Sequence, residues 1–152
     1  MIFIDTDVFV IDLRYRRDDN YDDNKLFLSK AASSGATTSY YNILEVCGIL
    51  SFNLNKEQLF DLYYHFPRRY NLKEIRPLKP QDRLPAFSIS SLMNVMGMKA
   101  SFGDTLVICA AKELGEKLDC FVSWNAEHFR GKLDLDVLTP VEYLRRQDNN
   151  RD

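Results

Sequence analysis

Apolar residues are arranged along the chain in short continuous runs and in stripes with helical spacing. The first run, residues 1–4, is apolar on both faces and includes two β-branched isoleucines, which predicts a strand in a buried, parallel sheet. Similar runs predict strands at residues 36–39, 119–124 and 135–138. We therefore expect an α/β domain in which strands alternate with helices.

Helical stripes lie between these runs. They predict helices at residues 25–34, 40–52, 56–66, 88–98, 106–114 and 141–146. Gly35 is expected to stop the first helix, and Pro67 to end the helix at 56–66, because proline disrupts helical hydrogen bonding. The helix at 88–98 carries an apolar stripe of Ile89, Leu92, Met93 and Met96, and we interpret its methionines as core filler.

Composition narrows the class of protein. A chain of 152 residues that is 45% hydrophobic and 28% charged is typical of one globular domain. Its formal net charge of -2 means that any affinity for nucleic acid has to come from a local patch or a bound cation. The widely spaced Cys47, Cys109 and Cys120 predict buried free thiols. With no signal sequence and no membrane-length apolar run, we expect a cytoplasmic protein without membrane contact.

Two carboxylates follow the first predicted strand directly. Asp5 and Asp7 stand where ligands bind in open α/β sheets, in the crevice outside the carboxyl ends of the strands. The alternative is that Asp5, Thr6 and Asp7 form only a turn or a helix N-cap, which Asp and Thr do routinely. The choice between the two depends on which other polar residues reach the same crevice.

Glu45 interrupts a helix that is apolar nearly all round. A carboxylate on a buried helix needs a cation or hydrogen-bond donors, because burying it bare costs several kcal/mol or more. Asn42 is three residues away and lies on the same side of the helix. The alternative is that Glu45 pairs with an arginine or reaches solvent.

Further polar residues are placed at the ends of other elements. Asp104 stands at the N-terminus of the helix at 106–114, where an N-cap is its most frequent role, and Ser123 and Asn125 follow a strand. Carboxylates that converge in one crevice repel one another unless a cation neutralises them. Oxygen ligands select a hard cation, so the sequence predicts Mg²⁺ or Mn²⁺ and argues against zinc.

Residues 68–83 form the most basic stretch of the chain, and prolines interrupt it. Its cations are Arg68, Arg69, Lys73, Arg76, Lys79 and Arg83. A solvated loop is one interpretation of this charge run. A patch that contacts phosphates, with Tyr70 available for stacking on a base, is the other, and the sequence favours neither.

Four motifs follow one another along almost the whole chain. They are Ile-Asp-Thr-Asp-Val at 4–8, Asn-Ile-Leu-Glu at 42–45, Asp-Thr-Leu-Val-Ile-Cys-Ala-Ala at 104–111 and Ser-Trp-Asn-Ala-Glu-His-Phe at 123–129. Their order and spacing resemble the PIN domain, and in particular the toxin ribonucleases of prokaryotic VapBC-type systems. Each motif is short, but the four in this order are considerably more specific than any one of them.

The resemblance implies a three-layer α/β PIN-like fold over residues 1–152, with a central parallel sheet flanked by helices and a basic, helical insertion at 67–98. The family cleaves RNA, and its toxins are usually dimers that a cognate antitoxin inhibits. We therefore expect an RNA substrate, a homodimer and an antitoxin partner.

The resemblance also assigns roles to residues. Asp5, Glu45 and Asp104 match the carboxylates that hold Mg²⁺ or Mn²⁺, and Glu45 completes the metal shell or orients the attacking water. Asn125 falls at the fourth, usually acidic, catalytic position and brings no charge. Contacts with the substrate are expected from Arg68, Arg69, Arg76 and Ser123.

The leading hypothesis is a metal-dependent endoribonuclease that acts as the toxin of a toxin–antitoxin module. The alternative is a PIN-like regulatory module that binds RNA or protein. Its catalysis would be weakened because Asn125 brings no charge to the pocket. A small phosphatase or receiver-like domain fits less well, because the chain lacks a glycine-rich phosphate loop. His128 fits a structural role better than a catalytic one.

Overall fold

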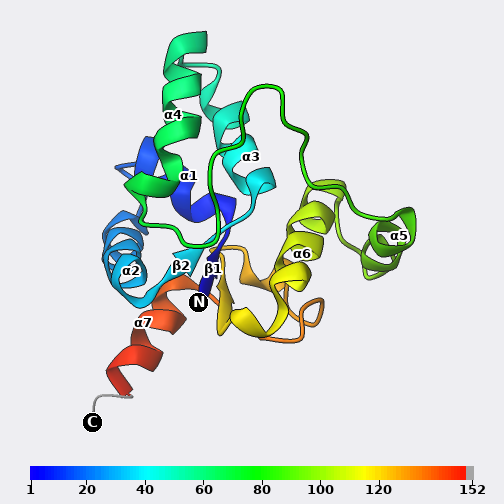
Figure 1. Cartoon of the computed structure of the whole chain (residues 1–152). Helices are drawn as coiled ribbons and strands as arrows, with labels where there is room; N and C mark the ends of the chain where they lie inside the picture. The colour runs from blue at the N-terminus through cyan, green and yellow to red at the C-terminus, as the bar shows by residue number, and fades with distance from the viewer. Residues whose placement is uncertain (150–152) are drawn as a thin grey trace.

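The computed structural model describes residues 1–149, in which one sheet of four strands forms the centre (Figure 1). The strands are β1 (Ile2–Ile4), β2 (Ala36–Thr37), β3 (Cys120–Val122) and β4 (Asp136–Leu138), in the order β2-β1-β3-β4. All neighbouring pairs are parallel, with Phe3 in register with Phe121, and Phe121 with Val137. The predicted parallel sheet is confirmed. The predicted domain runs to residue 152, and its last three residues lie outside the described part.

Helices cover both faces of this sheet, which gives the three-layer α/β arrangement (Figure 1). They are α1 (Thr6–Arg14), α2 (Tyr21–Ser34), α3 (Tyr40–Leu50), α4 (Lys56–Arg69), α5 (Ile89–Gly97), α6 (Phe102–Leu114) and α7 (Pro140–Asn149), with short 3-10 turns η1 (Gly115–Lys117) and η2 (Ala126–His128). Within residues 1–149, none of the helices combines the length and the apolarity that crossing a membrane requires.

The two faces of the sheet bury separate cores. On one face, Ile2, Ile4 and Val122 pack with side chains of α1, α2, α3, α4 and α7. On the other face, Phe3 stacks on Phe121 with ring centroids 5.1 Å apart, against side chains of α6. All three residues of β1 are buried, as its uninterrupted apolar run predicts for a strand covered on both faces.

The helix α1 was not predicted from the pattern of the sequence. It begins directly after Asp5, whose carboxylate accepts the backbone N–H of Thr6 at 2.8 Å and caps the helix. Residues 8–11 are all buried, so this helix shows no regular polar stripe, and its apolar run resembles a continuation of the first strand.

Pro67 lies inside α4 and does not end it. Its missing N–H removes one helical hydrogen bond, and only Arg68 and Arg69 follow before the helix ends. Phe66 and Pro67 are buried, and the carbonyl of Pro67 accepts the N–H of Leu72 at 2.8 Å, which closes the chain onto the helix. The predicted end of this helix, residue 66, is therefore wrong by three residues.

The apolar stripe of α5 is largely exposed to solvent. Ile89 is 75% exposed and Met93 is 60% exposed, while Val95 is the buried residue of this helix. The helix packs on α6 and lies beyond it, away from the sheet (Figure 1), so only one narrow side of it is covered. The prediction that the methionines of this stripe fill the core is therefore wrong for Met93.

The segment between α4 and α5 is irregular and runs across α3 (Figure 1). Two tyrosines at the start of α3 hold it: the Tyr40 hydroxyl donates to the carbonyl of Arg76 at 2.9 Å, and the Tyr41 hydroxyl donates to the carbonyl of Pro85. Between residues 67 and 98, the helical parts are the end of α4 and α5. That this stretch is an insertion stays a prediction.

Candidate functional site

A polar pocket of about 230 Å³ opens at the carboxyl ends of β1 and β3, and we refer to it as the carboxylate pocket. Its lining is Asp5, Thr6, Asp7, Val10, Glu45, Ile49, Asp104, Val107, Asn125, His128 and Phe129. The structure therefore brings Asp5, Glu45, Asp104 and Asn125 to one place, from four different parts of the chain. This is the crevice where open α/β sheets bind their ligands.

Asp5 is buried at the base of the pocket, with 7% of its surface exposed. One carboxylate oxygen accepts the backbone N–H of Thr6 and, at 3.1 Å, the side-chain amide of Asn42, while the other accepts the hydroxyl of Ser123 at 2.8 Å. Burial, together with the charge of Asp7, raises the pKa of Asp5 to about 7. Asp5 is thus a helix cap and also lies in the pocket at the carboxyl end of β1, whereas its binding of a ligand there stays a prediction.

Asp7 forms a pair with Asp5 through a shared serine. The hydroxyl of Ser123 lies 3.0 Å from Asp7 Oδ2, which also accepts the backbone N–H of Asn125 at 3.0 Å and its side-chain amide at 3.2 Å. Burial raises the pKa of Asp7. The other oxygen, Asp7 Oδ1, is buried and has no hydrogen-bond partner among residues 1–149. That oxygen is therefore desolvated without a compensating donor among these residues.

Asn42 is a structural part of the site. The only sequence signal for this was its spacing of three residues from Glu45, which places the two on the same side of the helix. Asn42 is fully buried, and its amide donates to Asp5 and, at 3.0 Å, to the hydroxyl of Thr6. Its own carbonyl oxygen accepts the hydroxyl of Ser39, the N-cap of α3. Asn42 therefore fixes the orientation of the Asp5 carboxylate from the start of α3.

Glu45 lies at the rim of the pocket and is exposed, so the expectation of a buried Glu45 is wrong. The side of α3 that carries Leu44 and Glu45 faces solvent, because the helix lies at the edge of the core. The carboxylate accepts the hydroxyl of Thr6 at 2.5 Å. Burial therefore does not require a cation beside Glu45, and its position at the rim leaves it open to a ligand.

Asp104 reaches the pocket from the opposite helical layer. It lies in the first turn of α6, whose N-cap is Ser101, and its backbone N–H donates to the Ser101 hydroxyl at 3.1 Å. The expectation that Asp104 itself caps the helix is therefore wrong. Its half-buried carboxylate accepts no hydrogen bond from any residue within 1–149 and lines the pocket.

The oxygen atoms of the carboxylate pocket fit a divalent cation in part. Two features fit Mg²⁺ or Mn²⁺: the ligating atoms are all oxygens, and Asp7 Oδ1 is buried without a partner. In the described part of the chain, no group of three or more His, Cys, Asp or Glu side chains is arranged to hold a metal ion. A cation there would complete its shell with water or with substrate, as Mg²⁺ usually does.

The arginines predicted to contact substrate lie outside this pocket. Arg68, Arg69 and Arg76 are exposed and do not line it. Arg69 is 3.9 Å from the carboxylate of Asp12. Ser123 is fully buried beneath the carboxylates, so it holds Asp5 and Asp7 and has no surface open to a substrate.

Tyr70 is not available for stacking on a base, so that expectation is wrong. It is buried, with its ring 4.7 Å from that of Phe9 and 5.0 Å from that of Phe66, between centroids. Its hydroxyl donates to Asp12 at 2.7 Å. His128 does reach the carboxylate pocket, as an exposed side chain of η2.

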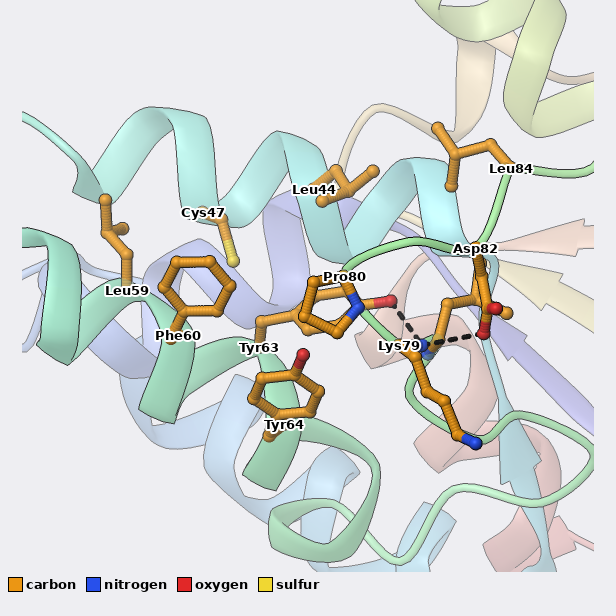
Figure 2. Close-up of a pocket in the computed structure, with 11 residues that line it drawn as sticks. Leu44, Cys47, Leu59, Phe60, Tyr63, Tyr64, Lys79, Pro80, Asp82 and Leu84 are labelled. Carbon is orange, nitrogen blue, oxygen red and sulfur yellow. Dashed lines mark hydrogen bonds between the residues drawn. The ribbon is translucent and has the colours of Figure 1, made fainter.

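A second hollow, of about 280 Å³, lies on the other side of α3 (Figure 2). Figure 2 shows Leu44, Phe60 and Tyr63 around it, from α3 and α4, with Pro80 and neighbouring residues of the irregular segment as its third wall. Asp82 is the carboxylate residue that lines this hollow, and it accepts the backbone N–H of Lys79 at 2.8 Å. The hollow is mostly apolar, and its lining contains no pair of carboxylates.

No family model, curated protein or solved structure matches the chain. The resemblance to the PIN domain therefore stays a prediction that rests on the four motifs.

Proposed function

We propose that this protein is an Mg²⁺- or Mn²⁺-dependent endoribonuclease with a PIN-like fold. The observation that carries the proposal is the pair formed by the buried Asp5 and the half-buried Asp7, which share Ser123 at the carboxyl end of a parallel sheet and leave the buried atom Asp7 Oδ1 unpartnered among residues 1–149. Two such carboxylates with raised pKa values favour either a bound proton or a bound cation.

Each residue of the pocket has a role in this proposal. Asp5 and Asp7 would ligate the cation, and Asp104 would face it from the opposite wall of the pocket; a bound cation would supply Lewis-acid stabilisation of charge on the scissile phosphate. Ser123 and Asn42 donate hydrogen bonds that keep Asp5 oriented, and Asn125 does the same for Asp7. Asn125 is thus a positioning residue in this proposal, whereas its sequence position suggested a catalytic one.

Glu45 differs from the buried carboxylates because it is exposed at the rim. Its hydrogen bond from Thr6 fixes one oxygen, and the exposed carboxylate orients a water molecule toward the phosphate. The pocket thus combines a cation site at its base with a carboxylate at its mouth.

For the cellular role, we propose the toxin of a toxin–antitoxin module, which acts on RNA as a homodimer and is held inactive by a cognate antitoxin. The support for this role is the resemblance of the four motifs. The three cysteines are free thiols, and two of them are buried, which is consistent with a cytoplasmic location.

One observation favours a second function, that of a catalytically weakened binding module. The fourth acidic position holds Asn125, and no three carboxylates within residues 1–149 are arranged around one point. Such a module would bind RNA or protein without cleaving it, and it would keep that affinity when a pocket carboxylate is replaced.

The test is cleavage of a mixed-sequence RNA pool by wild type and Asp104→Asn, with Mg²⁺, with Mn²⁺ and with EDTA. We expect wild type to cleave only with metal, and Asp104→Asn to lose on the order of 100-fold or more in rate, because a preorganised charge at the site is removed. Asp134→Asn is the matched control, since it makes the same change at an exposed loop position. Cleavage in EDTA, or an Asp104→Asn variant as active as wild type, would contradict the proposal, and absence of cleavage from wild type favours the binding module.

A further inference from the structure

The carboxylate pocket continues along one face of α1. Thr6, Asp7 and Val10 line the pocket, and Arg14 follows on the same face at helical spacing. Seven residues separate Asp7 from Arg14, which places their backbones about 10 Å apart along the helix axis at ~1.5 Å per residue. Arg14 therefore stands two helical turns beyond Asp7, toward the C-terminus of α1.

The neighbouring helix α3 also links the carboxylate pocket to Arg14. Ile49 lines the carboxylate pocket one turn beyond Glu45. The guanidinium of Arg14 donates to the carbonyl of Ile49 at 3.3 Å. Because α1 packs against α3 (Figure 1), the surface between the two helices leads from the pocket to Arg14.

At this end the chain gathers three arginines and a tyrosine, which we name the Arg14 cluster: Arg14, Tyr15, Arg16 and Arg17. Together with Asp18 they line a surface hollow of about 540 Å³. The guanidinium of Arg14 lies 5.5 Å from the centre of the Tyr15 ring, and Tyr15 is 45% exposed. The cluster thus presents both cations and an aromatic face to solvent.

The charges of the Arg14 cluster are available to a ligand. All three arginines are exposed, and none of them forms an ion pair with any residue within 1–149. The nearest carboxylate in sequence, Asp18, accepts the backbone N–H of Asn20 at 2.8 Å. Arg69, by contrast, lies near Asp12 on the other side of α1.

We propose that the Arg14 cluster is a binding subsite for the phosphate backbone of single-stranded RNA, with Tyr15 stacking on a base. The subsite lies two helical turns along α1 from the carboxylate pocket, within reach of the same RNA strand. It provides the attraction that an acidic pocket cannot, because the pocket carboxylates repel an approaching phosphate backbone. The inference rests on the proposed ribonuclease function and names where its substrate is held.

The experiment compares Arg16→Gln/Arg17→Gln with Lys25→Gln/Arg145→Gln, a control that removes two exposed cations elsewhere. Binding of a fluorescent, mixed-sequence single-stranded RNA is measured by anisotropy over a salt series, in the Asp104→Asn background with Mn²⁺. We expect Kd to rise on the order of 10-fold for the arginine variant, and the slope of log K against log salt to fall by about 0.7 for each phosphate that the variant no longer neutralises. Tyr15→Ala is expected to weaken binding at least about 5-fold, because the base loses its stacking partner.

Steady-state cleavage in the wild-type background separates the two proposals. The arginine variant is expected to raise KM while kcat stays unchanged, because the cluster binds RNA outside the reacting atoms. If wild type cleaves with metal but the arginine variant and the control have equal Kd and KM, the subsite is wrong and the ribonuclease stands. If wild type neither cleaves nor binds RNA, both proposals are overturned.

Discussion

At the scale of single residues, the pocket is defined by how few donors reach its carboxylates. Asp5 accepts three hydrogen bonds, yet its pKa is raised to about 7, because burial and the neighbouring charge of Asp7 outweigh the donors. Asp7 keeps one buried oxygen without any partner among residues 1–149. Without a compensating charge or proton, such a pair lowers the stability of the fold.

This imbalance predicts how stability depends on pH in EDTA. The unfolded chain has Asp5 at an ordinary pKa of 3.8, whereas the folded chain has it at about 7, so the folded state binds more protons between these values. The free energy of unfolding should therefore fall as pH rises from about 4 to 7, by up to a few kcal/mol. In Asp5→Asn this dependence should be largely lost.

Urea denaturation of both proteins across that pH range is the measurement. Asp134→Asn, with its exposed carboxylate, serves as the control and should follow wild type. Parallel curves for wild type and Asp5→Asn would show that Asp5 titrates normally in the folded protein.

At the scale of elements, the site depends on the first turns of two helices. Asp7 lies in the first turn of α1 and Asp104 in the first turn of α6, and each helix is capped by another residue, Asp5 or Ser101. The positive end of each helix dipole therefore faces a carboxylate of the pocket.

The elements also show what a sequence can predict. Strand β1 and the pocket position of Asp104 follow from local patterns, because an apolar run and a polar residue at a helix start carry their own signals. The exposure of Glu45 and Met93 does not, because it depends on how far α3 and α5 lie from the sheet. The Asp7–Ser123 contact joins residues 116 apart in sequence and is likewise a product of tertiary packing.

The orientation of α5 gives a prediction at this scale. Val95 is 3% exposed, so Val95→Ala should lower the free energy of unfolding by about 1–2 kcal/mol. Met93→Ala removes a larger side chain from the same helix but should change stability by less than about 0.5 kcal/mol, because Met93 faces solvent. Chemical denaturation of the two variants tests this, and a larger loss from Met93→Ala would place the apolar stripe in the core after all.

At the scale of the whole molecule, the carboxylate pocket joins the two helical layers. Asp5, Asp7 and Glu45 come from the sheet and from α1 and α3 on one face, whereas Asp104 comes from α6 on the other face. Within residues 1–149, no hydrogen bond or ion pair holds the Asp104 carboxylate in place. A cation at the pocket would therefore connect the layers as well as neutralise the carboxylates.

That connection predicts a metal-dependent gain in thermal stability. A cation that binds only the folded chain adds about 2.7 kcal/mol at 100 times its Kd, which for a domain of this size raises Tm by about 5–10 °C. Mn²⁺ should produce this shift in wild type and in Asp134→Asn, and little of it in Asp7→Asn or Asp104→Asn. Calorimetry at pH 7.5 with Mn²⁺ and with EDTA gives the comparison. An equal shift in all four proteins would place the cation outside the pocket, whereas no shift in wild type would leave the Asp5–Asp7 pair to be neutralised by a proton.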